Sequence, residues 1–207
     1  MKTTNFQLDI VALLVSDITK SYTIREISQT LKKNYRNTYE AIQDLATKKI
    51  IKKNRVGRAD ACSLDIKENA ATDILARAED LRKEDFVMRY KPIKALLNDI
   101  VIKLSKYTAF YCLVVFGSYA EFKARENSDL DVLVIAQDLK HKKDFIKEIS
   151  SLQTLALVKI SAIIIDENEF AAMLNSKEEV NVGKETVKKH IILYNSKIYW
   201  EMVKNAL

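Results

Sequence analysis

The stretch VVFGSYAEFKARENSDLDVLVI, residues 114–135, contains two apolar runs separated by a polar segment. The first run ends at Gly117 and Ser118, and the second begins around Asp129 and Asp131. Short apolar runs bounded by turn residues are typical of buried strands. Alternate residues of a strand face the same side, so the two aspartates should point the same way while the leucine between them points into the core. The stretch therefore predicts two strands, with a pair of carboxylates at the start of the second.

These paired carboxylates predict a cation site. Two negative charges side by side repel each other, so the arrangement is costly unless a cation lies between them. Mg²⁺ is a hard ion that takes one or two protein carboxylates and completes its shell with water and phosphate oxygens. Gly117 allows a phosphate to approach the backbone closely, and Ser118 can donate its hydroxyl and its N–H to phosphate oxygens. We therefore expect Asp129 and Asp131 to bind Mg²⁺ and the Gly-Ser pair to bind phosphate.

Gly-Ser, ten residues and Asp-x-Asp between apolar strands together resemble the nucleotidyltransferase superfamily of DNA polymerase β. The likeness is to its small form, found in antibiotic nucleotidyltransferases and minimal prokaryotic nucleotidyltransferases. It implies a metal-dependent transfer of a nucleoside monophosphate from a nucleoside triphosphate to an acceptor, with release of pyrophosphate. By this resemblance Gly117 and Ser118 hold the triphosphate, and Asp129 and Asp131 are catalytic metal ligands.

The loop before the aspartates is a further candidate part of the site. Lys123 and Arg125 lie in this loop. They are candidate contacts for the nucleotide phosphates or for the acceptor, and the alternative is that they are solvated loop charges.

The third carboxylate of the family has no obvious counterpart. It usually lies on a later strand, shares the catalytic metal and helps to activate the acceptor hydroxyl. Here the strand-like run LALVKISAIII places Ser161 at that position, or Lys159 in a slipped register, and neither is acidic. We expect this departure to impair catalysis more than nucleotide binding. Alternatively, the acid comes from elsewhere, for instance from Glu121 or from a partner subunit.

Residues 1–67 predict a second fold. Three amphipathic helical segments, FQLDIVALLVS, TIREISQTLKK and YRNTYEAIQDLATKK, precede two strand-like runs around the turn RVGRA. Thr23 and Glu26 form a capping box at the start of the second segment. Three short helices followed by a hairpin is the order of a winged helix-turn-helix, in which the third helix lies in the DNA major groove and the wing touches the backbone.

The positive charge is concentrated in this first third of the chain. Residues 1–67 carry 13 Lys/Arg against 7 Asp/Glu, whereas the other residues carry 21 of each. A basic patch on one small domain favours a polyanion partner. We therefore expect residues 1–67 to bind double-stranded DNA. The candidate contacts are Arg36 and Asn37 of the third helix and Lys52, Lys53, Arg55 and Arg58 of the hairpin.

The whole chain is predicted to be an α+β or α/β protein. Its predicted parts are a winged helix-turn-helix at 1–67, a helical connector and packing helix at 68–106, and a nucleotidyltransferase domain with a mixed sheet flanked by helices at 107–207. No apolar run reaches the roughly 18 residues of a membrane helix, and the first residues do not resemble a signal peptide. Two cysteines, Cys62 and Cys112, make a disulfide framework improbable. We expect a cytoplasmic protein without membrane contact.

Three functions are open at this point. The first is an active Mg²⁺-dependent nucleotidyltransferase that the winged helix locates on DNA or on a partner. The second is a DNA-binding transcriptional regulator whose transferase domain is weak or inactive and only senses nucleotide. The third is a protein-interaction module, such as one half of a toxin–antitoxin pair. The acceptor, the nucleobase, the DNA sequence and the formation of a homodimer are not determined by the sequence.

Overall fold

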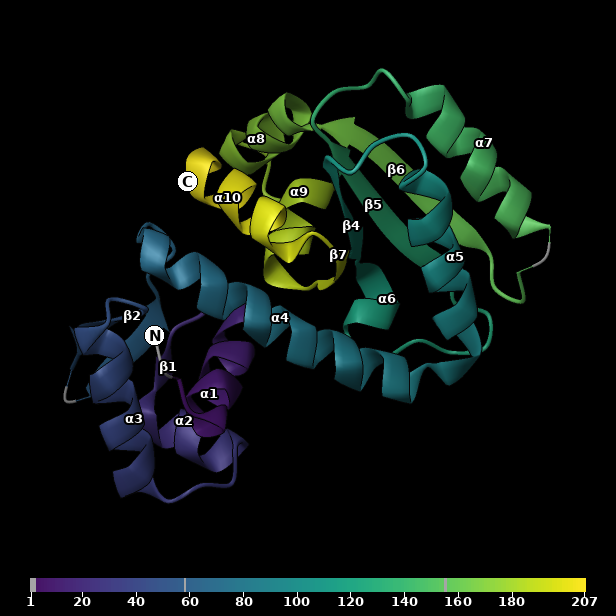
Figure 1. Ribbon diagram of the computed structural model, residues 1–207. Coiled ribbons are helices and arrows are strands. Elements are labelled where there is room, and N and C mark those ends of the chain that lie inside the picture. The colour runs from purple at the N-terminus through teal and green to yellow at the C-terminus, as the bar shows by residue number, and fades with distance from the viewer. Residues whose placement is uncertain (1–2, 58, 155) are drawn as a thin grey trace. The chain divides into compact units, whose positions relative to one another are not determined.

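The computed structural model describes residues 3–57, 59–154 and 156–207. The chain divides into two compact units, Met1–Leu81 and Arg82–Leu207. The long helix α4 (Asn69–Arg89) runs across this division (Figure 1). The division therefore falls inside the segment 68–106 that was predicted to be a helical connector.

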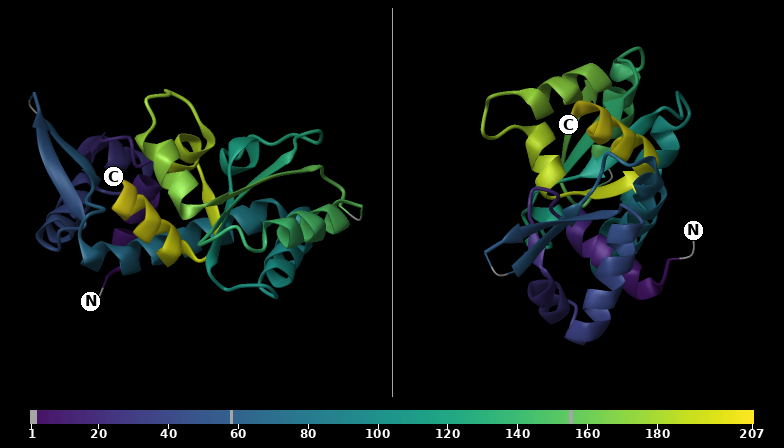
Figure 2. Two further views of the ribbon diagram at one scale, coloured as in Figure 1. Left: turned by 90° about the horizontal axis from the view of Figure 1, so that it is seen from above. Right: turned by 90° about the vertical axis from the view of Figure 1, so that its left-hand side faces the viewer.

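The first unit combines three helices with a small sheet. Its elements before α4 are α1 (Asn5–Val15), β1 (Tyr22–Thr23), α2 (Ile24–Thr30), α3 (Tyr35–Thr47), β2 (Ile51–Val56) and β3 (Ala59–Leu64). Strand β3 lies between β1 and β2 and pairs antiparallel with both. The β2–β3 hairpin extends away from the helices of its own unit (Figure 2). This is a winged helix-turn-helix, as predicted, with the two-residue strand β1 as an element that was not predicted.

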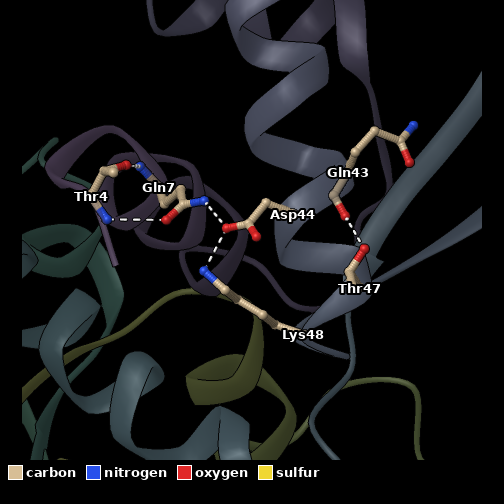
Figure 3. Close-up of polar contacts among 6 residues, drawn as sticks. All are labelled: Thr4, Gln7, Gln43, Asp44, Thr47 and Lys48. Carbon is tan, nitrogen blue, oxygen red and sulfur yellow. Dashed lines mark hydrogen bonds and ion pairs between the residues drawn. The ribbon is translucent and has the colours of Figure 1, made fainter. Parts of the chain in front are cut away.

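Capping interactions fix the starts of the helices. Thr4 and Gln7 form a capping box on α1, and Thr23 and Glu26 form the predicted one on α2. The Gln7 side-chain amide also donates a hydrogen bond to Asp44 of α3, and the Lys48 ammonium donates to the same carboxylate oxygen (Figure 3). These bonds hold the pKa of Asp44 below its ordinary value, with Lys48 the larger cause. The polar cluster thus ties the start of α1 to the end of α3.

The apolar core of the first unit determines which side of α3 faces solvent. Its fully buried side chains come from all three helices and from the sheet: Ile10, Val11, Ile27, Ile42, Leu45, Ile50 and Cys62. On α3 the inward stripe is Thr38, Ile42 and Leu45. The opposite side of the helix carries Arg36 and Glu40, which are exposed. The third helix therefore presents a polar face to solvent.

The second unit is built around a four-stranded sheet. After α4, its elements are η1 (Lys91–Ile93), α5 (Lys94–Leu104), β4 (Tyr111–Val115), α6 (Gly117–Ala120), β5 (Leu130–Ala136), α7 (Lys142–Gln153), β6 (Ile160–Asp166), α8 (Glu167–Asn175), α9 (Val182–Lys188), β7 (Ile191–Tyr194) and α10 (Ser196–Ala206). The strand order is β6-β5-β4-β7. Strands β5 and β6 are parallel, and β4 is antiparallel to β5 and β7, so the sheet is mixed, as predicted.

Helices cover both faces of this sheet. Figure 1 shows α5 and α7 on one face and α8 and α10 on the other. The core under α5 and α7 is formed by alternate strand residues, among them Tyr111, Leu113, Val115, Leu130, Val132 and Val134. At the β7 edge, Arg82 and Lys83 donate hydrogen bonds to the backbone carbonyls of His190 and Leu193. These side chains bind backbone carbonyl groups that would otherwise have no hydrogen-bond partner at the edge of the sheet.

The strand predicted at 155–165 begins later than expected. The run 155–165 was predicted to be extended, but β6 begins at Ile160. The Gln153 side chain accepts a hydrogen bond from the Ile160 N–H and donates one to the Val158 carbonyl, which holds the preceding residues in a loop. Leu155 lies outside the described residues. Helix α9 was not predicted, and Asp166 caps α8.

Both cysteines are buried and free, Cys62 in β3 and Cys112 in β4. Burial raises the pKa of the Cys62 thiol to about 11 and that of the Cys112 thiol still further. Both thiols are therefore protonated packing groups at neutral pH. In the parts of the chain that the structure describes, no helix has the length and apolar character to cross a membrane.

Candidate functional site

Gly117 and Asp131 are in close contact. Strand β4 is fully buried and leads into Gly117, whose φ of +66° lies in the left-handed region that favours glycine. A Cβ atom at this position would lie 2.5 Å from Oδ2 of Asp131. The Phe116 N–H also donates a 3.1 Å hydrogen bond to the Asp131 carbonyl. The Gly-Ser turn and the Asp-x-Asp motif therefore meet in one place, and only glycine allows that approach.

The two aspartates flank a core residue. Leu130 is fully buried, whereas Asp131 is half-buried and Asp129, just before β5, is 38% exposed. The predicted alternation is thus present. Burial raises the pKa of Asp131 above its ordinary value, and the charge of Asp129 acts in the same direction. Because burial and the neighbouring charge disfavour the ionised form of Asp131, a cation bound between the two aspartates would stabilise the ionised pair.

Strand β6 brings Ser161 and Lys159 to the aspartates. In the parallel pairing Ser161 is the register partner of Asp131, and its hydroxyl acts to lower the pKa of that carboxyl against the effect of burial. The Lys159 ammonium lies 2.7 Å from Oδ2 of Asp129, and this contact raises the pKa of Lys159. The Lys159 carbonyl accepts the Leu130 N–H at 2.7 Å. The two positions considered for the third acid therefore both lie beside the Asp-x-Asp motif: Ser161 is next to Asp131, and Lys159 contacts Asp129.

The donor set fits a divalent cation held by two carboxylates. Among residues 3–57, 59–154 and 156–207, no group of three or more His, Cys, Asp or Glu side chains is placed to hold a metal. A hard ion such as Mg²⁺ nevertheless commonly binds through one or two carboxylates and takes its other ligands from water and phosphate. Asp129 and Asp131 would hold such an ion, and the absent side chain of Gly117 lets the Asp131 carboxylate lie against the backbone at that position.

The other predicted phosphate contacts lie on α6 and the loop after it. Ser118 is half-buried, and its carbonyl accepts the Lys123 N–H at 2.9 Å. The Lys123 ammonium lies 2.6 Å from a carboxylate oxygen of Glu121 and holds the pKa of Glu121 below its ordinary value. Arg125 is exposed, and its backbone N–H and carbonyl both bond Ser128. Roles for Ser118, Lys123 and Arg125 in nucleotide binding stay predictions.

The predicted DNA contacts lie on α3 and the hairpin of the first unit. The Arg36 side chain is 86% exposed and pairs with Glu40 at 3.1 Å, and Asn37 is exposed beside it. Lys52 is exposed, whereas the Lys53 ammonium donates a 2.7 Å hydrogen bond to the Gln43 side chain of α3. Arg58 lies outside the described residues.

A groove of about 890 Å³ lies between α2, the start of α3 and the hairpin. Of the predicted DNA contacts, Arg55 lines it. The lining also includes Arg25, Tyr35 and Tyr39, which sequence reasoning missed. The two tyrosines are four residues apart and lie outside the apolar stripe of the helix, which is a signal that could have identified them. Both are exposed aromatic side chains.

Residues 98–199 match the family model described as Polymerase beta, Nucleotidyltransferase. The matched segment contains all four strands of the sheet and the contact between Gly117 and Asp131. The second unit therefore carries a nucleotidyltransferase domain of the polymerase β family, as the resemblance implied. A comparison with curated proteins finds no significant match.

Solved structures similar to this chain include several transcription regulators. The adhesin competence repressor AdcR of Streptococcus pyogenes is 19% identical over 51% of this chain and 78% of its own, with a TM-score of 0.37. MepR, which regulates the multidrug efflux pump MepA of Staphylococcus aureus, is 17% identical over 50% of this chain and 81% of its own, with a TM-score of 0.35. The archaeal chromatin protein TrmBL2 is 14% identical over 84% and 70%, with a TM-score of 0.29.

Proposed function

We propose that this protein is a Mg²⁺-dependent nucleotidyltransferase, which transfers a nucleoside monophosphate from a nucleoside triphosphate to an acceptor and carries a DNA-binding winged helix. The observation that carries the proposal is the contact between Gly117 and Asp131, with 2.5 Å between a would-be Cβ atom and the carboxylate oxygen. It joins the phosphate-binding turn to the acidic pair in a domain of the polymerase β family. Nucleotidyltransferases of this family generally use a divalent metal.

In the proposed reaction, an acceptor oxygen forms a bond to the α-phosphorus. The bond from that phosphorus to the oxygen that bridges to the β-phosphate breaks, and pyrophosphate leaves with the electron pair. Bound Mg²⁺ would neutralise charge on the phosphate oxygens. Asp129 and Asp131 would hold the ion, while the bare backbone at Gly117 lets the phosphate chain approach. The acceptor proton passes to solvent, because Ser161 is not a base at neutral pH.

A second candidate function rests on Ser161. A neutral hydroxyl stands opposite Asp131, where the family resemblance implies a third carboxylate. This observation favours a regulator in which the second unit binds Mg²⁺–nucleotide without rapid turnover and the winged helix binds DNA. Both functions require binding of Mg²⁺–nucleotide. They differ in whether the nucleoside monophosphate is transferred to an acceptor.

Binding of the first unit to double-stranded DNA is part of both functions. The net charge of +6 on residues 1–67, the exposed Arg36 on the outer face of α3, and the groove lined by Arg25 and Arg55 support it. Cationic and aromatic side chains around one groove suit a phosphate backbone with bases beside it.

The test uses triphosphates labelled at the α-phosphate, incubated with the full chain, Mg²⁺ and a cell lysate. Transfer of label to an acceptor by the wild type, and none by Asp129→Asn combined with Asp131→Asn, supports the transferase. Asp99→Asn, an exposed carboxylate on α5, is the matched control. Calorimetry then separates the functions: Mg²⁺–nucleotide binding without transfer supports the regulator. Unchanged Mg²⁺–nucleotide binding in the double variant would contradict the assignment of Asp129 and Asp131 to the metal site.

A further inference from the structure

Lys159 brings a positive charge into direct contact with the acidic pair. Its ammonium lies 2.7 Å from Oδ2 of Asp129, which is the distance of a charge-assisted hydrogen bond. Its backbone carbonyl is bonded to Leu130, so the start of this side chain is fixed next to the motif. The ammonium therefore already compensates the charge of one of the two carboxylates.

The charge at the site follows from this contact. Two carboxylates and one ammonium leave a single net negative charge. A divalent cation that binds both aspartates would compete with the ammonium for Asp129. The Lys159 side chain is 74% exposed, so it can swing into solvent without disturbing the core. An exposed ion pair of this kind is weak enough for a divalent cation to displace it.

We propose that Lys159 is a built-in counter-cation, which pairs with Asp129 in the empty site, is displaced by a divalent cation, and thereby sets the metal affinity of the nucleotide site. The proposal rests on the proposed function, because it assumes that Asp129 and Asp131 bind metal. It goes beyond that function by assigning a regulatory residue that is neither a metal ligand nor the missing acid. The metal affinity of the wild type is lower than the two carboxylates alone would give.

The test measures Mn²⁺ binding to the full chain from the electron paramagnetic resonance signal of the free ion. The variants are Lys159→Met, which removes the charge and keeps the stem, and Lys159→Arg, which keeps the charge. Lys177→Met is the matched control, because Lys177 is an exposed lysine on the loop after α8. Melting temperatures in chelator show that each variant is folded, and Lys159→Gln replaces the methionine variant if that one is not.

We expect Lys159→Met to bind Mn²⁺ about three- to tenfold more tightly than the wild type, as the loss of a weak ion pair and of a nearby positive charge predicts. Lys159→Arg and Lys177→Met should bind like the wild type. Equal or weaker binding by Lys159→Met, while Asp129→Asn with Asp131→Asn loses binding, overturns the role of Lys159 and leaves the proposed function standing. Absence of Mn²⁺ binding in every variant, with and without triphosphate, overturns both.

Discussion

Ser161 lies directly opposite Asp131 in the parallel pairing of β6 with β5, and its hydroxyl acts to lower the pKa of Asp131, which burial raises. The hydroxyl adds no negative charge beside the carboxylate. A serine hydroxyl is also not a base at neutral pH. The site therefore has a pair of carboxylates whose neighbour in register can neither share a metal as an anion nor take a proton from an acceptor.

Ser161→Asp is expected to increase nucleotide transfer. A positioned general base typically contributes 10²–10⁴ in rate. If the rest of the site is competent, the new carboxylate faces Asp131 across adjacent strands and the transfer rate should rise by about 10²-fold or more. Initial rates of label transfer measure this, and Ser161→Asn is the uncharged control. The substitution Glu121→Gln tests the other acid that was considered for this role. Robust wild-type turnover that is insensitive to Glu121→Gln would show that the site is not impaired by its serine.

Gly117→Ala should abolish Mg²⁺–nucleotide binding and destabilise the chain. The left-handed backbone conformation costs a residue with a Cβ roughly 1–2 kcal/mol, and here the Cβ would also push the Asp131 carboxylate away. Gly57→Ala is the matched control, because Gly57 has a φ of +62° with nothing within 4 Å of its Cβ position. We expect Gly57→Ala to lower the melting temperature slightly and leave calorimetric nucleotide binding intact. Equal nucleotide affinity in the two variants would contradict the importance of the contact.

Asp131→Asn should stabilise the metal-free protein at neutral pH. Burial raises the pKa of Asp131 in the folded state, so the folded chain holds this proton more tightly than the unfolded chain. The contribution of Asp131 to the free energy of unfolding therefore falls as the pH rises above 3.8, the pKa of Asp131 in the unfolded chain, and through its raised pKa in the folded chain. Below pH 3.8 the wild type and the variant should differ little. Chemical denaturation of both proteins across this range, in chelator, measures the difference. A variant less stable than the wild type at pH 7 would refute the prediction.

DNA binding by the full chain should depend steeply on salt. Each phosphate that the protein neutralises lowers the logarithm of the binding constant by about 0.9 per tenfold rise in salt. Arg55→Ala on the hairpin should weaken binding to all duplexes alike, whereas Arg36→Ala on α3 should change the preference among sequences. Lys177→Ala in the second unit is the control. Gel-shift titrations measure these effects, and a lack of binding to any duplex at low salt would favour the protein-interaction function instead.

Much of the architecture could be predicted because its signals are local. Apolar periodicity identified the helices of the first unit, and the capping box of Thr23 and Glu26 placed the start of α2. The alternation around Leu130 placed both aspartates on the same side of β5. Such patterns depend on backbone geometry within a few residues, so the sequence carries them directly. The Gly-Ser and Asp-x-Asp motifs were readable for the same reason.

The relations between separate elements were decided by the tertiary structure. Whether Ser161 or Lys159 stands opposite Asp131 depends on the register of β6 against β5, which the packing of both strands between two layers of helices selects. The same register brings Lys159 to Asp129, thirty residues away in the chain. Likewise, Arg25 joins Arg55 around one groove because α2 and the hairpin pack together. The sequence determined which chemical groups this protein has and which strand or helix carries them, whereas folding determined which of them touch, because long-range contacts arise from packing and leave no local pattern.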